Sequence, residues 1–153
     1  ERLDLPDWWI CAGVLRSKIW GIDQNAQSDI DIVYFDPSDI SEATEKRHER
    51  QLCEWVDLPW SVKNQARMHL VNELPPYTSA QDAIAQFPET VTAIGVTKRD
   101  KFQLYLPYGA SDFTDRVIRP TPSFQVGTDR HSIFQRRVNE KGWRNDSSLH
   151  IQT

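Results

Sequence analysis

The sequence predicts an α+β domain in which short strands and short helices are mixed along the chain. Segments rich in apolar and β-branched residues, typical of strands, alternate with amphipathic or strongly charged segments typical of helices. The chain has no internal repeat and no low-complexity tract. Its 153 residues are enough for one core, so we expect residues 1–153 to form a single domain. The first residue is Glu rather than Met, which is consistent with a missing N-terminal segment.

The expected elements of the first half follow in order. The apolar run at 8–12 predicts a strand, and Gly13 then begins a short helix over 13–20. Polar turn formers fill 21–28, and a buried strand follows at 29–35. Asp39, with Glu42 three positions later, is typical of a helix N-terminus, so we expect a charged helix over about 39–56.

The second half alternates in the same way. We expect a strand at 60–66, a short helix at 79–86, a strand at 90–97, a charged turn at 98–101, a strand at 102–106, a weak helix at 111–117 and an amphipathic helix at 129–141. In the last helix Ile133, Phe134 and Val138 turn inward.

Two carboxylates two residues apart, Asp29 and Asp31, stand on the predicted strand at 29–35. Alternate side chains of a strand share a face, so the two acids point the same way, roughly 6–7 Å apart along the backbone. Such a pair repels itself unless a cation lies between its members, and a divalent metal ion is the simplest such cation. A solvated strand end is the alternative explanation.

Gly13 marks a junction between a strand and a helix, where the backbone can approach a ligand closely. The free N–H groups of a new helix bind anions such as phosphates. Arg16, on the same helix, could reach that side. A phosphate-binding turn beside two carboxylates suits nucleotidyl transfer assisted by Mg²⁺ or Mn²⁺.

A third group of polar residues lies in the segment 60–69. Read as a strand, this segment places Lys63, Gln65 and Arg67 on one face together with Ser61. We interpret this cationic face as a surface that binds phosphate and reads a base, with a solvent-facing side of the sheet as the alternative.

These residues resemble a family of small bacterial nucleotidyltransferase-like proteins. The resemblance is carried by D-I-D-I-V-Y-F-D at 29–36 and W-S-V-K-N-Q-A-R-M-H at 60–69, and further matches extend it over nearly the whole chain, at 5–16, 77–79, 82–84, 88–90, 93–96, 107–109 and 119–122. It implies the nucleotidyltransferase fold of the DNA polymerase beta superfamily, a mixed β-sheet flanked by helices. It also implies that Asp29 and Asp31 bind the metal and that Gly13 lies at the phosphate-binding turn.

Two positions depart from the superfamily pattern. Val14 follows Gly13 where Gly or Ser is usual, and no carboxylate stands in 60–69, where active members usually place a third acid that often acts as general base. Three functions therefore stay open. The first is transfer of a nucleoside monophosphate from a nucleoside triphosphate to an unknown acceptor. The second is a nucleotide- or partner-binding protein that retains the fold without turnover, and the third is an interaction domain that uses no nucleotide.

Charge and composition limit the partners. A net charge of −4 and a pI near 5.5 argue against binding a long nucleic acid, although a local basic groove stays possible. No apolar run approaches the roughly 18–20 residues of a membrane span, and no segment resembles a signal peptide. We expect a cytoplasmic protein in which Cys11 and Cys53 are reduced and buried.

Overall fold

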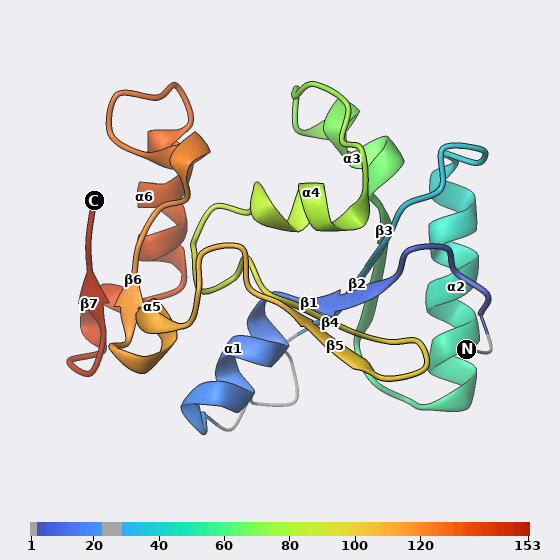
Figure 1. Cartoon of the computed structure of the whole chain (residues 1–153), viewed down its shortest axis with the longest axis horizontal. Helices are drawn as coiled ribbons and strands as arrows, with labels where there is room; N and C mark the ends of the chain where they lie inside the picture. Colours follow the sequence, from blue (N-terminus) through green and yellow to red (C-terminus); the bar gives the residue numbers. More distant parts are fainter. Residues whose placement is uncertain (1–2, 23–28) are drawn as a thin grey trace.

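A mixed five-stranded β-sheet forms the centre of the computed structural model, which describes residues 3–22 and 29–153 (Figure 1). Its strand order is β3-β2-β1-β4-β5. The strands are β1 (Trp9–Cys11), β2 (Ile30–Tyr34), β3 (Trp60–Asn64), β4 (Gly95–Lys98) and β5 (Phe102–Tyr105). β2 and β3 run parallel, whereas the other neighbouring pairs are antiparallel. The predicted α+β class, with a mixed sheet and flanking helices, is confirmed.

Helices flank this sheet on several sides. They are α1 (Gly13–Trp20), α2 (Glu42–Trp55), α3 (Gln65–Val71), α4 (Ala80–Ala85), α5 (Ser111–Thr114) and α6 (His131–Glu140), with 3₁₀ turns η1 (Pro122–Phe124) and η2 (Trp143–Asn145). A two-stranded parallel sheet of β6 (Val117–Ile118) and β7 (His150–Ile151) lies beside α6 (Figure 1). Among the described residues, no helix is both long enough and apolar enough to cross a membrane.

The register of the sheet decides which residues share a face. Cys11 of β1 and Ser61 of β3 both lie beside Asp31, so these three side chains point to one face. Ala80 and Ile84 of α4 pack on that face. The opposite face carries Ile32 and Val62, which pack with Leu52 of α2.

Phe134 and Val138 of α6 are fully buried in a second core at the end of the sheet. This core also contains Trp20 of α1 and Trp143 of η2, and Ile133 packs against it. The inward face predicted for the last helix is confirmed. Both cysteines are free thiols, and Cys11 is buried as expected, whereas Cys53 is exposed.

Helix α2 closes the edge of the sheet at β3. The carboxylates of Glu49 and Glu45 accept hydrogen bonds from the backbone N–H groups of Val62 (3.0 Å) and Asn64 (2.8 Å). These N–H groups point out of the sheet, where another strand would otherwise pair with them. Glu45 is completely buried by this arrangement.

Four expected elements were wrong in extent. The helix predicted at 111–117 ends at Thr114, and Val117 begins β6. The strand predicted at 60–66 ends at Asn64, because the Asn64 side chain caps α3 by accepting from the Ala66 N–H at 3.0 Å. The strand predicted at 90–97 begins only at Gly95, and buried turns precede it. The helix predicted from Asp39 begins at Glu42, while the Asp39 carboxylate accepts from the Ser41 N–H and the Thr44 hydroxyl.

Candidate functional site

Asp29 and Asp31 lie at the start of β2. Asp29 is exposed directly before the strand, and Asp31 is its second residue and half-buried. Burial raises the pKa of Asp31, a hydrogen bond with the Ser61 side chain counteracts this rise, and the negative charge of Asp29 adds to it. The two carboxylates are therefore close enough to repel each other.

The junction between β1 and α1 lies beside this pair, because Cys11, the last residue of β1, is in register with Asp31. Ala12 follows with φ 61° and ψ −132°, a conformation that L-residues rarely adopt, and its N–H donates to the Ile94 carbonyl at 3.2 Å. Gly13 then begins α1, as predicted. A Cβ at Gly13 would lie 3.8 Å from Arg16 Nη2, an ordinary contact, so packing does not require glycine there.

Arg16 lies one turn into α1, where its guanidinium is close to two tryptophan rings. Its Cζ lies 5.1 Å from the ring centroid of Trp143 and 5.7 Å from that of Trp20. The Nε atom is buried without a hydrogen-bond partner among residues 3–22 and 29–153. Burial lowers the pKa of Arg16, partly offset by the negative charge of Glu89.

Asp29, Asp31 and Ser61 offer oxygen donors for a metal ion, but the residues that the structure describes place no third carboxylate beside them. Ser61 occupies the position in register with Asp31 on β3, and within the described ranges no group of three His, Cys, Asp or Glu residues is placed to hold a metal ion. Two carboxylates nevertheless fit Mg²⁺ or Mn²⁺, because such ions are commonly held by one or two carboxylates together with water and substrate phosphates.

Residues 1–149 match a sequence family described as nucleotidyltransferase. The chain belongs to this nucleotidyltransferase family. A solved NMR structure described as a CCA-adding enzyme head domain is 34% identical with a TM-score of 0.85, covering 99% of this chain and 84% of that one. A chain from the structure of a tRNA-processing enzyme complex has a TM-score of 0.60. At 17% identity it shows the fold alone, and the match covers 95% of this nucleotidyltransferase chain and 40% of the other. No curated protein sequence matches.

The cations predicted from the segment 60–69 of this chain point toward α2. Lys63 Nζ lies 3.6 Å from Glu49 and 3.9 Å from Glu45. Arg67 is on α3 rather than on a strand, and its guanidinium makes two hydrogen bonds to Glu45, at 3.0 and 2.7 Å. Gln65 is buried and donates to the Lys63 carbonyl at 3.4 Å. The predicted face of four strand residues does not form, because the strand ends at Asn64.

Arg137 and Lys141 were not singled out in the sequence, yet their positive charges act on Asp31 and oppose the rise of its pKa. Both belong to the α6 region: Arg137 lies on the helix, and Lys141 is the residue after its end. Their spacing of four residues is a usable signal for one helix face. Nothing in the sequence connects that face with a strand more than 100 residues earlier.

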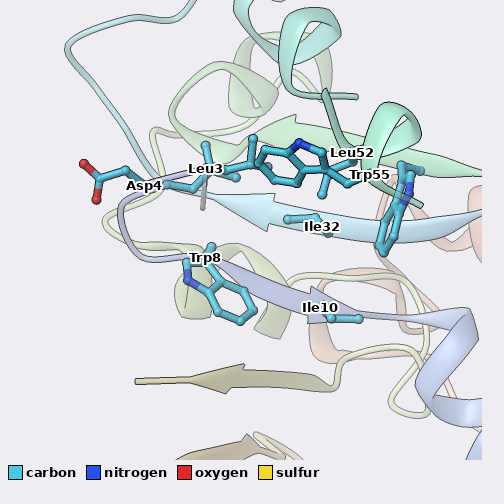
Figure 2. Close-up of a pocket in the computed structure, with 9 residues that line it drawn as sticks. Leu3, Asp4, Trp8, Ile10, Ile32, Leu52 and Trp55 are labelled. Carbon is cyan, nitrogen blue, oxygen red and sulfur yellow. The ribbon is translucent and has the colours of Figure 1, made fainter. Parts of the chain in front are cut away.

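A hollow of about 280 Å³ lies on the face of the sheet opposite Asp31 (Figure 2). Ile10 and Ile32 form part of its wall, and the rest is lined by Leu3, Asp4, Leu5, Trp8, Leu52, Trp55 and Trp60. Figure 2 shows apolar and aromatic side chains around it, with the Asp4 carboxylate directed away from the other labelled residues. None of the predicted site residues lines the hollow.

Proposed function

We propose that this protein transfers a nucleoside monophosphate from a nucleoside triphosphate to an acceptor hydroxyl. The acceptor oxygen forms a bond to the α-phosphorus, the bond between the α-phosphorus and the bridging oxygen breaks, and pyrophosphate leaves. The hydroxyl proton is released to solvent. The observation that carries this proposal is the pair Asp29 and Asp31, one of them half-buried, beside the junction at Gly13.

Asp29 and Asp31 would hold Mg²⁺ or Mn²⁺, which neutralises phosphate charge and activates a hydroxyl when bound. The backbone at Gly13 carries no Cβ, so a phosphate can approach the start of α1 closely. Arg16 supplies a partly buried positive charge on the same helix. We assign no phosphate contact to Lys63, Gln65 or Arg67. Lys63 and Arg67 are directed toward glutamates of α2, Gln65 donates to the Lys63 carbonyl, and none of the three is among the groups whose charge or hydrogen bond acts on Asp31.

A nucleotide-binding protein without turnover is the second candidate. Ser61 stands in register with Asp31 at the place where active superfamily members usually carry a third carboxylate. A serine hydroxyl cannot take up the acceptor's proton near neutral pH as a carboxylate can, so binding could persist where transfer is slow.

The nature of the acceptor stays open, and RNA belongs among the candidates to be tested. The net charge argued against a long nucleic acid. The 34% identity with a structure described as a CCA-adding enzyme head domain removes that argument as an exclusion.

The first experiment measures thermal and urea stability with each nucleoside triphosphate, with and without Mg²⁺ or Mn²⁺. A ligand at 100 times its Kd should add about 2.7 kcal/mol to the free energy of unfolding. The variants Asp29→Asn and Asp31→Asn should lose this gain, whereas Asp100→Asn, in the exposed turn between β4 and β5, should keep it. Equal gains in all four proteins would refute the metal role of the pair.

The second experiment separates the enzyme from the binding protein. Pyrophosphate release is followed with the nucleotide that binds best and with RNA, protein and small-hydroxyl acceptors. Release that disappears in Asp31→Asn supports transfer. Metal-dependent binding without release for any acceptor supports the second candidate.

A further inference from the structure

Helix α6 places two cations four residues apart near the Asp29/Asp31 pair. Residues at this spacing lie on the same face of a helix, so Arg137 and Lys141 are neighbours on α6 and at its end. Figure 1 shows α6 on the side of the molecule toward which β1 runs and where α1 begins. Trp143, two residues after Lys141, lies against Arg16 of α1, with 5.1 Å between the ring centroid and the guanidinium Cζ, so the end of α6 lies beside the helix that begins at Gly13. The positive charges of Arg137 and Lys141 accordingly act on Asp31.

The direction of Arg137 is fixed by a buried carboxylate. Its Nε and Nη2 atoms donate to the two oxygens of Glu89, at 2.5 and 3.1 Å. Glu89 is completely buried and also accepts from the Thr92 hydroxyl at 2.7 Å. A bidentate pair of this kind holds a guanidinium in one orientation.

The turn that carries Glu89 also holds the junction before α1. The Ala93 N–H donates to the Glu89 carbonyl at 3.0 Å, and the next residue, Ile94, accepts from the Ala12 N–H at 3.2 Å. One short segment therefore connects the orientation of Arg137 with the start of α1. The electrostatic interaction of Arg16 with both Glu89 and Arg137 places a third cation in the same cluster.

The whole C-terminal segment differs in charge from the rest of the chain. Residues 116–153 contain seven Lys and Arg against three Asp and Glu, a net charge of +4. Residues 1–115 contain eleven against nineteen, a net charge of −8, and the two parts together give the −4 of the chain. The acidic chain thus concentrates its excess of positive charge in the segment that contains α6.

Lys141 differs from Lys63 in whether an acidic side chain already neutralises its charge. Lys63 lies within 4 Å of two glutamates of α2. Lys141 is exposed and its ammonium group makes no ion pair with any residue in 3–22 or 29–153. Its charge is therefore available for an anion that reaches the carboxylate pair.

We propose that α6 forms the cationic wall that binds the triphosphate of the incoming nucleotide, with Lys141 in contact with phosphate oxygens and Arg137 oriented toward them by Glu89. This inference rests on the proposed function, because it names the groups that receive the phosphates at the same site. Glu89 acts as a positioning residue through Arg137.

The test compares the Kd of the Mg²⁺ complex of the best-binding nucleoside triphosphate for single lysine variants. Lys141→Gln should weaken binding about tenfold, and Lys141→Arg should restore it, because a phosphate contact requires the charge. Lys101→Gln, in the exposed β4–β5 turn, is the matched control and should bind like the wild type. The Kd of the corresponding nucleoside monophosphate should change less than that of the triphosphate.

The outcomes separate this inference from the function on which it rests. If the wild type binds no nucleotide, or binds it equally after Asp31→Asn, both the function and the cationic wall are wrong. If binding depends on Asp31 while Lys141→Gln matches Lys101→Gln, only the wall is wrong. A larger loss for Lys63→Gln than for Lys141→Gln would also overturn it and would return the phosphates to β3.

Discussion

The carboxylate of Asp31 lies half-buried between the Ser61 hydroxyl and the negative charge of Asp29. Burial is the largest cause of its raised pKa, and the repulsion from Asp29 adds to it against the Ser61 hydrogen bond. The ionised form is thus less favourable in the folded protein than in the unfolded chain. A bound divalent cation would stabilise the ionised form of Asp31 in the folded protein. Without the cation, the ionised Asp31 lowers the free energy of unfolding.

We expect Asp31→Asn to be more stable than the wild type at pH 7 in the absence of divalent metal. As pH rises above the ordinary aspartate value of 3.8, the unfolded chain loses the Asp31 proton before the native state does. The free energy of unfolding of the wild type therefore falls with pH through the raised pKa, whereas the variant lacks this fall.

Urea denaturation from pH 3 to pH 7 measures the difference between these two proteins. The two curves should meet at the acidic end, where Asp31 is protonated in both states, and separate toward neutral pH. A variant that is less stable than the wild type at pH 7 without metal would show that Asp31 already has a compensating cation.

Ala12 holds the strained backbone between β1 and α1, with φ 61° on a residue that has a Cβ. Ala12→Gly should raise the free energy of unfolding by about 1 kcal/mol, because relief of strain exceeds the added entropy of the unfolded chain. Ala110, before α5, has φ −106°, and Ala110→Gly there should instead lose up to about 1 kcal/mol. Urea midpoints of the two variants decide the point, and a loss of stability in both would show that φ at Ala12 carries no strain.

Single residues of the site differ in how far the sequence could locate them. Asp29, Asp31 and Gly13 depend on local patterns, a strand period and a strand–helix junction, and the structure places them together. The direction of the Arg67 side chain is set by its hydrogen bonds to Glu45, 22 residues earlier in the chain. A preference for that carboxylate over a phosphate is decided by tertiary packing, which no local pattern contains.

Arg137 of helix α6 is paired with Glu89, which lies in the turns before β4. Glu89 has no exposed side-chain surface, and the Arg137 side chain is 32% exposed. The hydrogen bonds and charge of Glu89 hold the pKa of Arg137 above its usual value against the effect of burial. Removal of one partner leaves a buried charge without compensation, which is more costly than removal of both.

Arg137→Met should therefore lower the free energy of unfolding by about 3 kcal/mol, the lower end of the range for a buried pair because the arginine is partly exposed. Arg136→Met is the matched control on the same helix. Arg136 is 67% exposed and lies 3.8 Å from Glu140, so its loss should cost at most about 0.5 kcal/mol. Urea denaturation of both variants gives the comparison.

The double variant Glu89→Gln with Arg137→Met keeps this test decisive if Arg137→Met does not fold. Neutralising both partners should recover part of the lost stability, because no unpaired charge stays buried. A double variant as unstable as Arg137→Met would show that packing of the arginine stem, rather than the charge, accounts for the lost stability.

Elements with strong local signals were predicted closely, and those decided by side-chain hydrogen bonds were not. α1 begins and ends where expected, at Gly13 and Trp20. The stretch before β4 is rich in β-branched residues, which favoured a strand. Its buried Thr90 and Thr92 hydroxyls instead bind Asp112 (2.6 Å) and Glu89 (2.7 Å), so the backbone forms turns.

At the scale of the whole molecule, the fold class and the flanking of the sheet by helices followed from the alternation of element types and from the resemblance to a known family. The net charge alone did not reveal how charge is distributed along the chain, because it adds the +4 of residues 116–153 to the −8 of residues 1–115. The expectation against a long nucleic acid rested on this net charge, which does not exclude such a partner.

This separation of charge predicts how salt affects nucleotide binding. A uniformly acidic protein would bind an anionic nucleotide better as salt screens their repulsion. Because Arg137 and Lys141 of the basic segment act on Asp31, we expect the Kd of the Mg²⁺–nucleotide complex to rise between about 0.05 M and about 0.3 M NaCl. Calorimetry at constant free Mg²⁺ measures the change, and a falling Kd would contradict it. Lys141→Gln should show a weaker dependence.

The two long edges of the main sheet differ in what they offer to another chain. At β3 the carboxylates of Glu45 and Glu49 already accept the outward N–H groups, so lateral growth of the sheet is blocked there. β5 is the other edge, and its Phe102 and Leu104 side chains are 77% and 63% exposed. Any self-association by strand pairing is therefore directed to β5. The four residues of β5 thus form the border of the main sheet at which a strand of a second copy could add.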